Sequence, residues 1–427
     1  MRAPIYGVGV DLDLDLFDSS NPPVVLVGGL NLVRALGRAG LDVIVAYWDP
    51  EEPAFSSRYC KGRVDLPRPD GDGSAAAALM ALGAEVAGRL GRRIPLLCGS
   101  DDSLTVVQAN RHRLQRHFLF LMPDADVACA LVAKDRFGAF ARHRGLPVPR
   151  SLTWNGDGPG SVRGTEGPVV VKPNAKADWH HTVLCQKLFD GAGKARVFES
   201  GADAAVHPVV VEYARQLTFQ EFVPGGDNDH WSFHGFADES GRVIASFIGR
   251  KVRTFPVGAG ESAFIELAHD EGLEALGREV AARCPLQGLF KMDFKRDPRD
   301  GRWHLLEINA RASLWLNLGA ANGVNLPRVA YDYLVYGRAP EPLRALTRYR
   351  WLSLGLDWRA ARELARRGDL GFIAWARSIL ASRNIYNLFS WTDPAPWFAL
   401  WKARFVRRVI RAPGRVFSML PWRSTAS

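Results

Sequence analysis

A βαβ pattern near the N-terminus constrains the fold more than any other feature of the chain. The apolar run Val24–Val27 is followed by Gly28-Gly29, by a helical stretch over residues 30–39 and by a second strand pattern over residues 41–47. Neighbouring parallel strands need a crossover connection, usually a helix, so this order predicts a parallel sheet with helices on its faces. A further strand pattern over residues 94–98 extends the same domain.

The glycine pair after the first strand is not a dinucleotide fingerprint. Gly28-Gly29 lacks the second and third glycines of G-x-G-x-x-G, although Asp49 lies about 20 residues further on, where a ribose-binding acid is expected. We favour a structural turn, with a nicotinamide or flavin site as the alternative.

Composition excludes several classes of protein. The 427 residues suffice for two to four domains at ~100–200 residues each, and a 47% hydrophobic content argues against a disordered chain. No apolar run approaches the ~20 residues of a membrane-spanning helix, and the acidic residues between positions 11 and 18 argue against a signal peptide. The five cysteines are scattered without a C-x-x-C pair, so we expect reduced thiols and a cytoplasmic location.

The basic charge is confined to the C-terminal segment. Residues 338–427 contain 17 basic and 5 acidic residues, whereas residues 1–337 contain 38 basic and 40 acidic ones. The same segment holds seven of the thirteen tryptophans. This distribution argues against a general nucleic-acid-binding body and favours a basic, aromatic attachment surface.

A hairpin pattern over residues 288–309 predicts a metal site. By the two-residue period of a strand, Glu307 and Asn309 share one face, and Asp293 on the preceding strand can be presented beside them. Two carboxylates and an amide oxygen are hard ligands that suit Mg²⁺, whose shell substrate phosphates usually complete. Arg311 follows within reach of the same place. An ordinary solvated hairpin face is the alternative.

The strand pattern over residues 244–254 carries three cations in four residues. Lys251 and Arg253 are expected on one face and Arg250 on the other. Like charges repel at this density, so the strand suits a position opposite polyphosphate. A solvated edge strand is the alternative.

With further motifs, these residues resemble the ATP-grasp superfamily, and within it the carboxylate–amine ligases related to D-aspartate ligase. The resemblance extends from about residue 24 to residue 337, and its specificity lies in the order of six modest motifs. These are Ala-Lys134-Asp-Arg-Phe, Val-Val-Val-Lys172-Pro, the hinge Gln220-Glu221-Phe222-Val223-Pro224-Gly225, Asp229 (or Asp227), the basic strand over residues 249–256, and Glu307-Ile308-Asn309-Ala310-Arg311 with Asp293 before it.

The resemblance implies an α/β fold in four parts. They are an N-terminal lead-in at residues 1–21, a Rossmann-like parallel-sheet domain at 22–125, a two-subdomain ATP-grasp domain at 126–337 with its smaller subdomain at roughly 150–222, and a basic, aromatic-rich, mainly helical extension at 338–427.

The resemblance also implies roles for the site residues. The nucleotide is expected on Lys134, Lys172, Gln220, Glu221, Phe222, Val223 and Asp229, and Mg²⁺ (or Mn²⁺) on Asp293, Glu307 and Asn309. The expected catalytic cations are Arg311, Arg253, Lys251 and Arg250.

The implied reaction converts a carboxylate to an acyl phosphate with ATP and joins it to an amine or thiol, releasing ADP and phosphate. Kinase-like phosphotransfer and a non-catalytic, membrane-docked ATP-binding protein are the alternatives. The expected partners are small-molecule or lipid-linked carboxylates and amines, and no nucleic acid.

The loop after Lys172 departs from the family pattern. Residues 174–181 contain no glycine, whereas many ATP-grasp enzymes close a glycine-rich loop over the phosphates. Backbone amides and Lys176 are the substitutes available there. His180 and His181 have no further metal ligand beside them in the sequence, and we expect them at the loop surface.

The segment 397–411 predicts a basic amphipathic helix, and no acidic residue follows Asp393. Contact of residues 394–427 with the anionic inner face of a membrane is one interpretation. Packing of the apolar arc on the rest of the protein is the other. The predicted apolar arc consists of Phe398, Trp401, Phe405, Val406 and Val409, and the basic one of Arg404, Arg407, Arg408 and Arg411.

Overall fold

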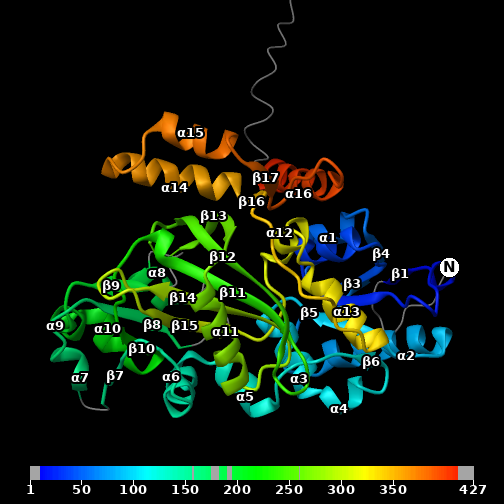
Figure 1. The fold of residues 1–427 in the computed structure, drawn as a ribbon, viewed down its shortest axis with the longest axis horizontal. Helices are drawn as coiled ribbons and strands as arrows, with labels where there is room; N and C mark the ends of the chain where they lie inside the picture. Colours follow the sequence, from blue (N-terminus) through cyan, green and yellow to red (C-terminus); the bar gives the residue numbers. More distant parts are fainter. Residues whose placement is uncertain (1–9, 156–157, 175–181, 190–194, 259, 412–427) are drawn as a thin grey trace, which may run out of the picture.

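Three β-sheets organise the chain in the computed structural model (Figure 1). The structure describes residues 10–155, 158–174, 182–189, 195–258 and 260–411. The orange and red C-terminal helices lie together along the upper edge of the view, outside the green and yellow strands.

The first sheet has six strands in the order β1-β4-β3-β2-β5-β6, and every neighbouring pair except β1–β4 is parallel. All four residues of Val24–Val27 are buried, as expected for a parallel strand covered on both faces. The βαβ prediction is therefore confirmed. The strands are β1 (Val10–Leu12), β2 (Val24–Val27), β3 (Val43–Tyr47), β4 (Cys60–Asp65), β5 (Ile94–Cys98) and β6 (Phe118–Leu119), and the helices α1 (Leu30–Arg38), α2 (Ser74–Leu90), α3 (Asp101–Ala109) and α4 (Arg111–Leu114).

The backbones that leave β2 and β5 touch each other. A Cβ on Gly28 would lie 2.9 Å from the Cα of Gly99, and the N–H of Gly99 donates to the carbonyl of Val27 at 2.9 Å. Only glycine permits so close an approach, so Gly28 of the glycine pair has a structural role at this turn.

The second sheet is antiparallel, with the order β7-β10-β8-β9. Val169 and Val171 are buried in its core while Lys172 between Val171 and Pro173 is not, which is the alternation of a one-sided strand. The strands are β7 (Ser151–Leu152), β8 (Val169–Pro173), β9 (Arg196–Phe198) and β10 (Leu217–Glu221). The helices are α5 (Ala125–Val132) and α6 (Lys134–His143), which precede the sheet, and α7 (Gly160–Arg163), α8 (Val183–Phe189), α9 (Gly201–Val206) and α10 (Pro208–Tyr213).

The third sheet has seven strands in the order β15-β14-β11-β12-β13-β16-β17, antiparallel except for the last pair. The sequence did not predict β16 and β17, which the C-terminal segment adds to the edge of the sheet. The strands are β11 (His230–Ala237), β12 (Val243–Phe255), β13 (Glu261–Ala268), β14 (Gly288–Arg296), β15 (Trp303–Asn309), β16 (Tyr349–Leu352) and β17 (Arg383–Tyr386). The helices are α11 (Glu271–Arg283), α12 (Leu316–Ala321), α13 (Leu326–Tyr336), α14 (Leu354–Arg367), α15 (Phe372–Leu380) and α16 (Ala395–Arg411).

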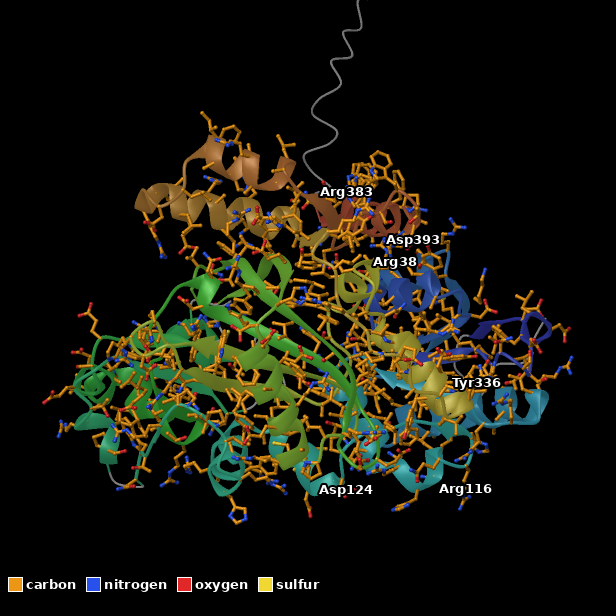
Figure 2. All side chains as sticks on the ribbon, viewed as in Figure 1. Arg38, Arg116, Asp124, Tyr336, Arg383 and Asp393 are labelled. Atoms are coloured by element: carbon orange, nitrogen blue, oxygen red, sulfur yellow. The ribbon has the colours of Figure 1, made fainter. Side chains whose placement is uncertain are left out.

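Two buried ion pairs attach the C-terminal segment to the rest of the protein. Asp393, just before α16 and labelled in Figure 2, accepts from Arg34 Nε of α1 at 2.9 Å; Arg34 itself is not labelled there. Asp357 on α14 accepts from Arg253 Nε of β12 at 2.7 Å. All four side chains are at least nine-tenths buried.

Among the described residues, no helix is both long and apolar enough to cross a bilayer.

We expect Asp393→Ala to destabilise the protein strongly. Asp393 also accepts from Ser57 Oγ and the Arg58 amide, each at 2.9 Å, and its removal leaves the Arg34 guanidinium buried without its carboxylate. Breaking a buried pair from one side costs about 3–5 kcal/mol, which urea unfolding would measure. Asp369→Ala, at an exposed acid of the same segment, should change the free energy of unfolding by no more than about 0.5 kcal/mol. Equal stability of the two variants would contradict the anchoring role.

Candidate functional site

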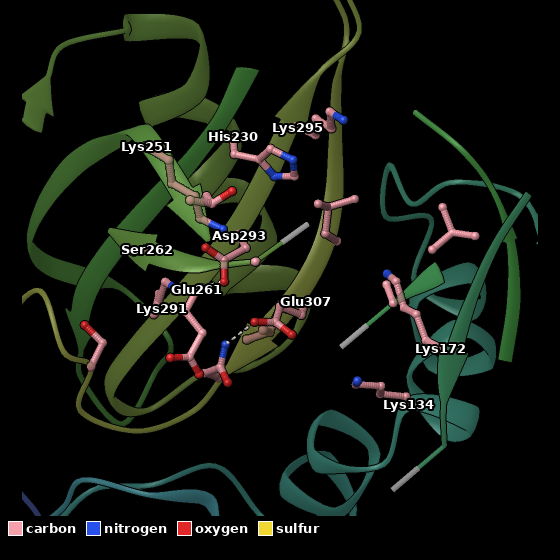
Figure 3. Close-up of a pocket in the computed structure, with 18 of the residues that line it drawn as sticks. Lys134, Lys172, His230, Lys251, Glu261, Ser262, Lys291, Asp293, Lys295 and Glu307 are labelled. Carbon is pink, nitrogen blue, oxygen red and sulfur yellow. Dashed lines mark hydrogen bonds and ion pairs between the residues drawn. The ribbon is translucent and has the colours of Figure 1, made fainter. Parts of the chain in front are cut away.

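A cavity of about 470 Å³ lies between the second and third sheets. In Figure 3, Lys134 and Lys172 extend from one side, and Lys251, Lys291, Asp293 and Glu307 from the other. The volume suits a small molecule such as a nucleotide. The polar and charged residues that line it include Asp101, Lys134, Lys172, Gln220, Glu221, His230, Lys251, Glu261, Ser262, Lys291, Asp293, Lys295, Glu307, Asn309 and Arg311.

The two lysines predicted to bind the nucleotide line this cavity together. Lys134 is the first residue of α6, and Lys172 lies on β8 between side chains that point into the core of the second sheet. Lys172 Nζ donates to Gln220 Oε1 at 3.0 Å. Burial lowers the pKa of Lys172, while the Glu307 carboxylate across the cavity opposes this shift. An anion bound between the sheets would therefore gain a poorly solvated cation as its partner.

The predicted hinge Gln220–Val223 also lines the cavity, where β10 ends. The backbone amide of Glu221 donates to the carbonyl of Arg150 at 3.0 Å, and that of Phe222 donates to Pro168 at 2.9 Å. The Glu221 carboxylate accepts from Arg150 Nε at 2.8 Å. Its partners Arg150 and Pro168 lie just before β7 and β8, so this end of the segment is attached to the second sheet, and its side chains form part of the wall.

The predicted metal ligands meet on the β14–β15 hairpin. Asp293 and Glu307 are opposite each other in the ladder, and Glu307 Oε1 accepts from Asn309 Nδ2 at 3.2 Å. Asp293 accepts from Lys291 Nζ at 2.7 Å and from Ser232 Oγ. The described residues contain no group of three or more His, Cys, Asp or Glu side chains that could hold a metal. Two carboxylates and an amide oxygen nevertheless fit Mg²⁺, because that ion commonly takes one or two protein carboxylates and completes its shell with phosphate and water.

Arg311 lies where the N-terminal domain meets the hairpin. Its Nε donates to Asp101 Oδ1 at 2.6 Å, and a terminal nitrogen donates to Asn309 Oδ1 at 3.3 Å. Asp101 begins α3, directly after β5 and Ser100, and also lines the cavity. The Arg311 guanidinium is therefore held by the Asp101 carboxylate, and it also contacts Asn309, one of the three predicted metal ligands.

Of the three cations predicted on β12, the structure brings only Lys251 to the cavity. Arg250 pairs with Glu266, and Arg253 is buried against Asp357 on the side of α14. The expectation that Lys251 and Arg253 share a face is wrong, because the β12–β13 register shifts between them and leaves Val252 without a paired residue. Neither arginine lines the cavity, so a catalytic role for them gains no support from the geometry.

The acids proposed for the ribose lie outside the described lining. Asp229 Oδ2 accepts from the Gly226 amide at 2.8 Å. Asp227 accepts from the Thr254 amide and hydroxyl, each at 2.7 Å, and from the Gly258 amide at 2.9 Å. Asp227 therefore holds the end of β12 in place, and the role of Asp229 stays a prediction.

Sequence reasoning missed His230 and did not assign Lys295. They are opposite each other on β11 and β14, and both line the cavity. Burial, with Lys251, Lys295 and Lys172 nearby, lowers the pKa of His230 to about 2, so the imidazole is neutral. The alternation of Lys291, Asp293 and Lys295 was the sequence signal for Lys295, whereas a lone histidine gives none. Lys176, His180 and His181 lie outside the described residues.

We expect Lys295 to make stability depend on pH. Burial is the main cause that lowers its pKa from 10.5 to about 8, although Asp229 and Asp227 oppose the shift. Between these values the unfolded chain binds more protons, so the free energy of unfolding rises with pH. Relative to Lys295→Met, the wild type should gain roughly 1–3 kcal/mol between pH 8 and pH 10.5.

Urea unfolding at several pH values measures this difference. Lys187→Met, at a half-exposed lysine of α8, should stay parallel to the wild type throughout. A constant difference between the wild type and Lys295→Met would show that Lys295 keeps an ordinary pKa.

Comparison with known proteins supports the fold. Residues 228–353 match the family described as ATP-grasp in the biosynthetic pathway with Ter operon. A D-aspartate ligase of Enterococcus faecium (strain Aus0004) is 23% identical over 255 residues, which is 57% of this chain and 59% of that protein. The chain thus aligns with less than two thirds of that relative's length.

Two solved structures show the same architecture. A biotin carboxylase from Campylobacter jejuni, in a β,γ-ATP complex, superposes with a TM-score of 0.55 at 12% identity, covering 77% of this chain and 74% of that one. An L-amino acid ligase from Bacillus licheniformis gives 0.50 at 14% identity, with 74% of both chains covered. The predicted resemblance is confirmed, and the chain has the ATP-grasp fold, with an N-terminal parallel-sheet domain and a C-terminal helical segment.

Proposed function

We propose that this protein is an ATP-dependent carboxylate–amine ligase that forms an acyl phosphate and then an amide, releasing ADP and phosphate. One observation carries the proposal. The cavity between the sheets has lysines on both walls, two carboxylates and an amide oxygen on the β14–β15 hairpin, and Arg311 just after β15. This arrangement is suited to a polyanion that binds with a divalent cation.

ATP is the substrate that fits these groups. Lys134 and Lys172 approach from the second sheet, and Lys251 and Lys291 from the third, so the triphosphate would lie between them. The hinge Gln220–Val223 forms the wall suited to the adenine. The biotin carboxylase of similar fold forms a β,γ-ATP complex, which supports ATP as the ligand of this cavity.

Asp293, Glu307 and Asn309 are the residues that would hold Mg²⁺. When bound, the ion would neutralise phosphate charge as a Lewis acid. In the described structure Lys291 makes an ion pair with Asp293, so the carboxylate is already held in position on its strand. Lys291 also lies 5.3 Å from the ring centre of Trp315, which limits the positions that its amine can reach.

The proposed reaction has two steps, and each develops negative charge that the cations of the cavity can stabilise. A substrate carboxylate oxygen bonds to the γ-phosphorus, the bond to the β,γ-bridging oxygen breaks, and ADP leaves. An amine next bonds to the acyl carbon through a tetrahedral oxyanion, and phosphate leaves as the amine gives up a proton. Arg311, held by Asp101, would stabilise the negative charge on the oxyanion or the departing phosphate.

Both similar ligases named above act, by their names, on amino acids. The D-aspartate ligase and the L-amino acid ligase therefore support an amino acid or a related amine as one substrate of this chain. An acceptor of this kind would need no covalent intermediate on the protein, because the acyl phosphate is already activated.

We expect Glu307→Gln to abolish most of the Mg²⁺-dependent gain in affinity for a non-hydrolysable ATP analogue. The amide keeps the shape of the side chain but cannot supply a negative ligand, so the gain should fall by at least about tenfold in calorimetric titrations. Glu274→Gln on α11, outside the cavity lining, is the matched control and should bind like the wild type. An undiminished magnesium effect in Glu307→Gln would refute the metal assignment.

The reaction type has a separate test. With ATP, Mg²⁺ and a panel of amino acid and dipeptide carboxylates, hydroxylamine should trap a hydroxamate with one ADP formed per product. Hydroxylamine replaces the amine at the acyl phosphate, whereas a kinase would leave a stable phosphorylated product. Stoichiometric AMP and pyrophosphate would overturn the acyl-phosphate route.

A further inference from the structure

The outer helices of the C-terminal segment expose large apolar side chains. We call six of them, with the basic residues among them, the aromatic–basic face. Their exposed fractions lie between 55% and 83%, although side chains of this size are usually mostly buried in a soluble domain. The apolar members are Phe372, Ile373 and Leu380 on α15 and Phe398, Trp401 and Phe405 on α16.

On each helix these side chains form one stripe. At 100° per residue, Phe398, Trp401 and Phe405 lie within an arc of about 60°. The rings of Trp401 and Phe405 are stacked, with centroids 5.6 Å apart. Phe372, Ile373 and Leu380 lie within about 100° on α15. Packing of the apolar arc of α16 on the rest of the protein, the other interpretation of this helix, therefore does not hold for its described side chains.

The inner side of the segment is occupied by contacts of a different kind. Asp393 anchors the start of α16 to Arg34, and α16 lies against the short helix Pro53–Ser56. Ile379 of α15 is buried with Phe264 and Leu352 of the third sheet. Each helix thus turns one side to the protein and leaves its large apolar stripe exposed. Figure 1 shows both helices in the upper part of the view.

The exposed charged side chains described on α15, β17 and α16 are basic, and the exposed acid Asp369 lies just before α15. Four exposed basic residues accompany the stripes: Arg377 on α15, Arg383 on β17, and Lys402 and Arg404 on α16 (Figure 2 labels Arg383). Between residues 370 and 405 the sequence contains one acidic residue, Asp393, which is buried in its ion pair with Arg34. The acid is therefore turned inward, and the cations face outward.

We infer that the aromatic–basic face binds the surface of an anionic lipid bilayer. Trp and Phe side chains on a helix that lies in the membrane plane enter the interface between headgroups and acyl chains. Flanking Lys and Arg side chains place their charges among the lipid phosphates. The inference does not depend on the proposed reaction.

Charge and chemistry favour this occupant over others. A second copy of the chain would bring an equally basic surface against the first, and like charges repel across such an interface. Nucleic acid could stack on Trp401 but offers no partner for the aliphatic Ile373 and Leu380. A bilayer accommodates the aromatic, aliphatic and basic groups together.

The test is co-sedimentation of the full chain with vesicles. Vesicles of phosphatidylcholine with about 30% phosphatidylglycerol should bind the protein, and pure phosphatidylcholine vesicles should bind it at least about tenfold more weakly. Raising the salt from about 0.1 M to 0.5 M should also weaken binding to the anionic vesicles by about tenfold, because the cations are exposed.

Two double variants separate the apolar and the basic contributions. Trp401→Gln/Phe405→Gln and Lys402→Glu/Arg404→Glu should each lower the affinity for anionic vesicles by at least about tenfold. The matched controls are Val206→Gln/Val211→Gln and Arg113→Glu/Arg163→Glu, which change exposed residues elsewhere and should bind like the wild type. Thermal unfolding would confirm that all four proteins are folded.

Three results would overturn the inference. One is the absence of binding to anionic vesicles at low salt, and another is equal binding by both α16 variants and their controls. The third is a self-complex, seen as a dimer by light scattering, or a complex with a short RNA, which both α16 variants fail to form although they still bind vesicles. That outcome would assign the face to a second copy or to nucleic acid.

Discussion

The antiparallel pairing of β14 with β15 is the constraint on which the candidate site depends. It sets Asp293 opposite Glu307, and the alternation along β15 adds Asn309 on the same face. A shift of β15 by one residue would turn Glu307 and Asn309 toward the apolar core that includes Met292, Phe294 and Ile308, while Asp293 stayed on its face of β14. The cost of burying the Glu307 carboxylate among apolar residues therefore helps to fix the register that the site needs.

Lys172 and Glu307 carry opposite charges on different walls of the cavity. Lys172 is half-buried on one wall, and Glu307, which acts electrostatically on it, lies on the other. Lys251 is half-buried near Asp293, Glu307 and Asp227, and its pKa is lowered by burial although these acids oppose the shift. Removing cations from water is costly, and a polyanion bound between the walls would recover part of that cost. We therefore expect the affinity of the site for a polyanion to depend on each of these lysines and carboxylates.

The sequence predicted the local structure well wherever one periodicity held along an element. The predicted strand over residues 94–98 coincides with β5, and both strands of the hairpin were placed within a residue or two. The side of β12 on which the Arg253 side chain lies was not predictable, because the register shift at Val252 cannot be recognised from the pattern of residue types. His230, Asp101 and the edge strands β16 and β17 were missed for a related reason. Their positions depend on contacts with other segments of the chain: His230 is paired with Lys295, Asp101 contacts Arg311, and β16 pairs with β13.

The division of the apolar cores has a mechanical consequence. The two largest cores of the described residues include side chains from both the first and the third sheets, and the C-terminal segment is tied to α1 by Asp393 and to β12 by Asp357. The core of the second sheet contains only residues 152–219 of its own unit. We therefore expect the first sheet, the third sheet and the C-terminal segment to move as one body, with the small unit that carries Lys172 pivoting about the hinge. Displacement of that single unit would widen or narrow the cavity while the hairpin and the outer helices keep their mutual orientation.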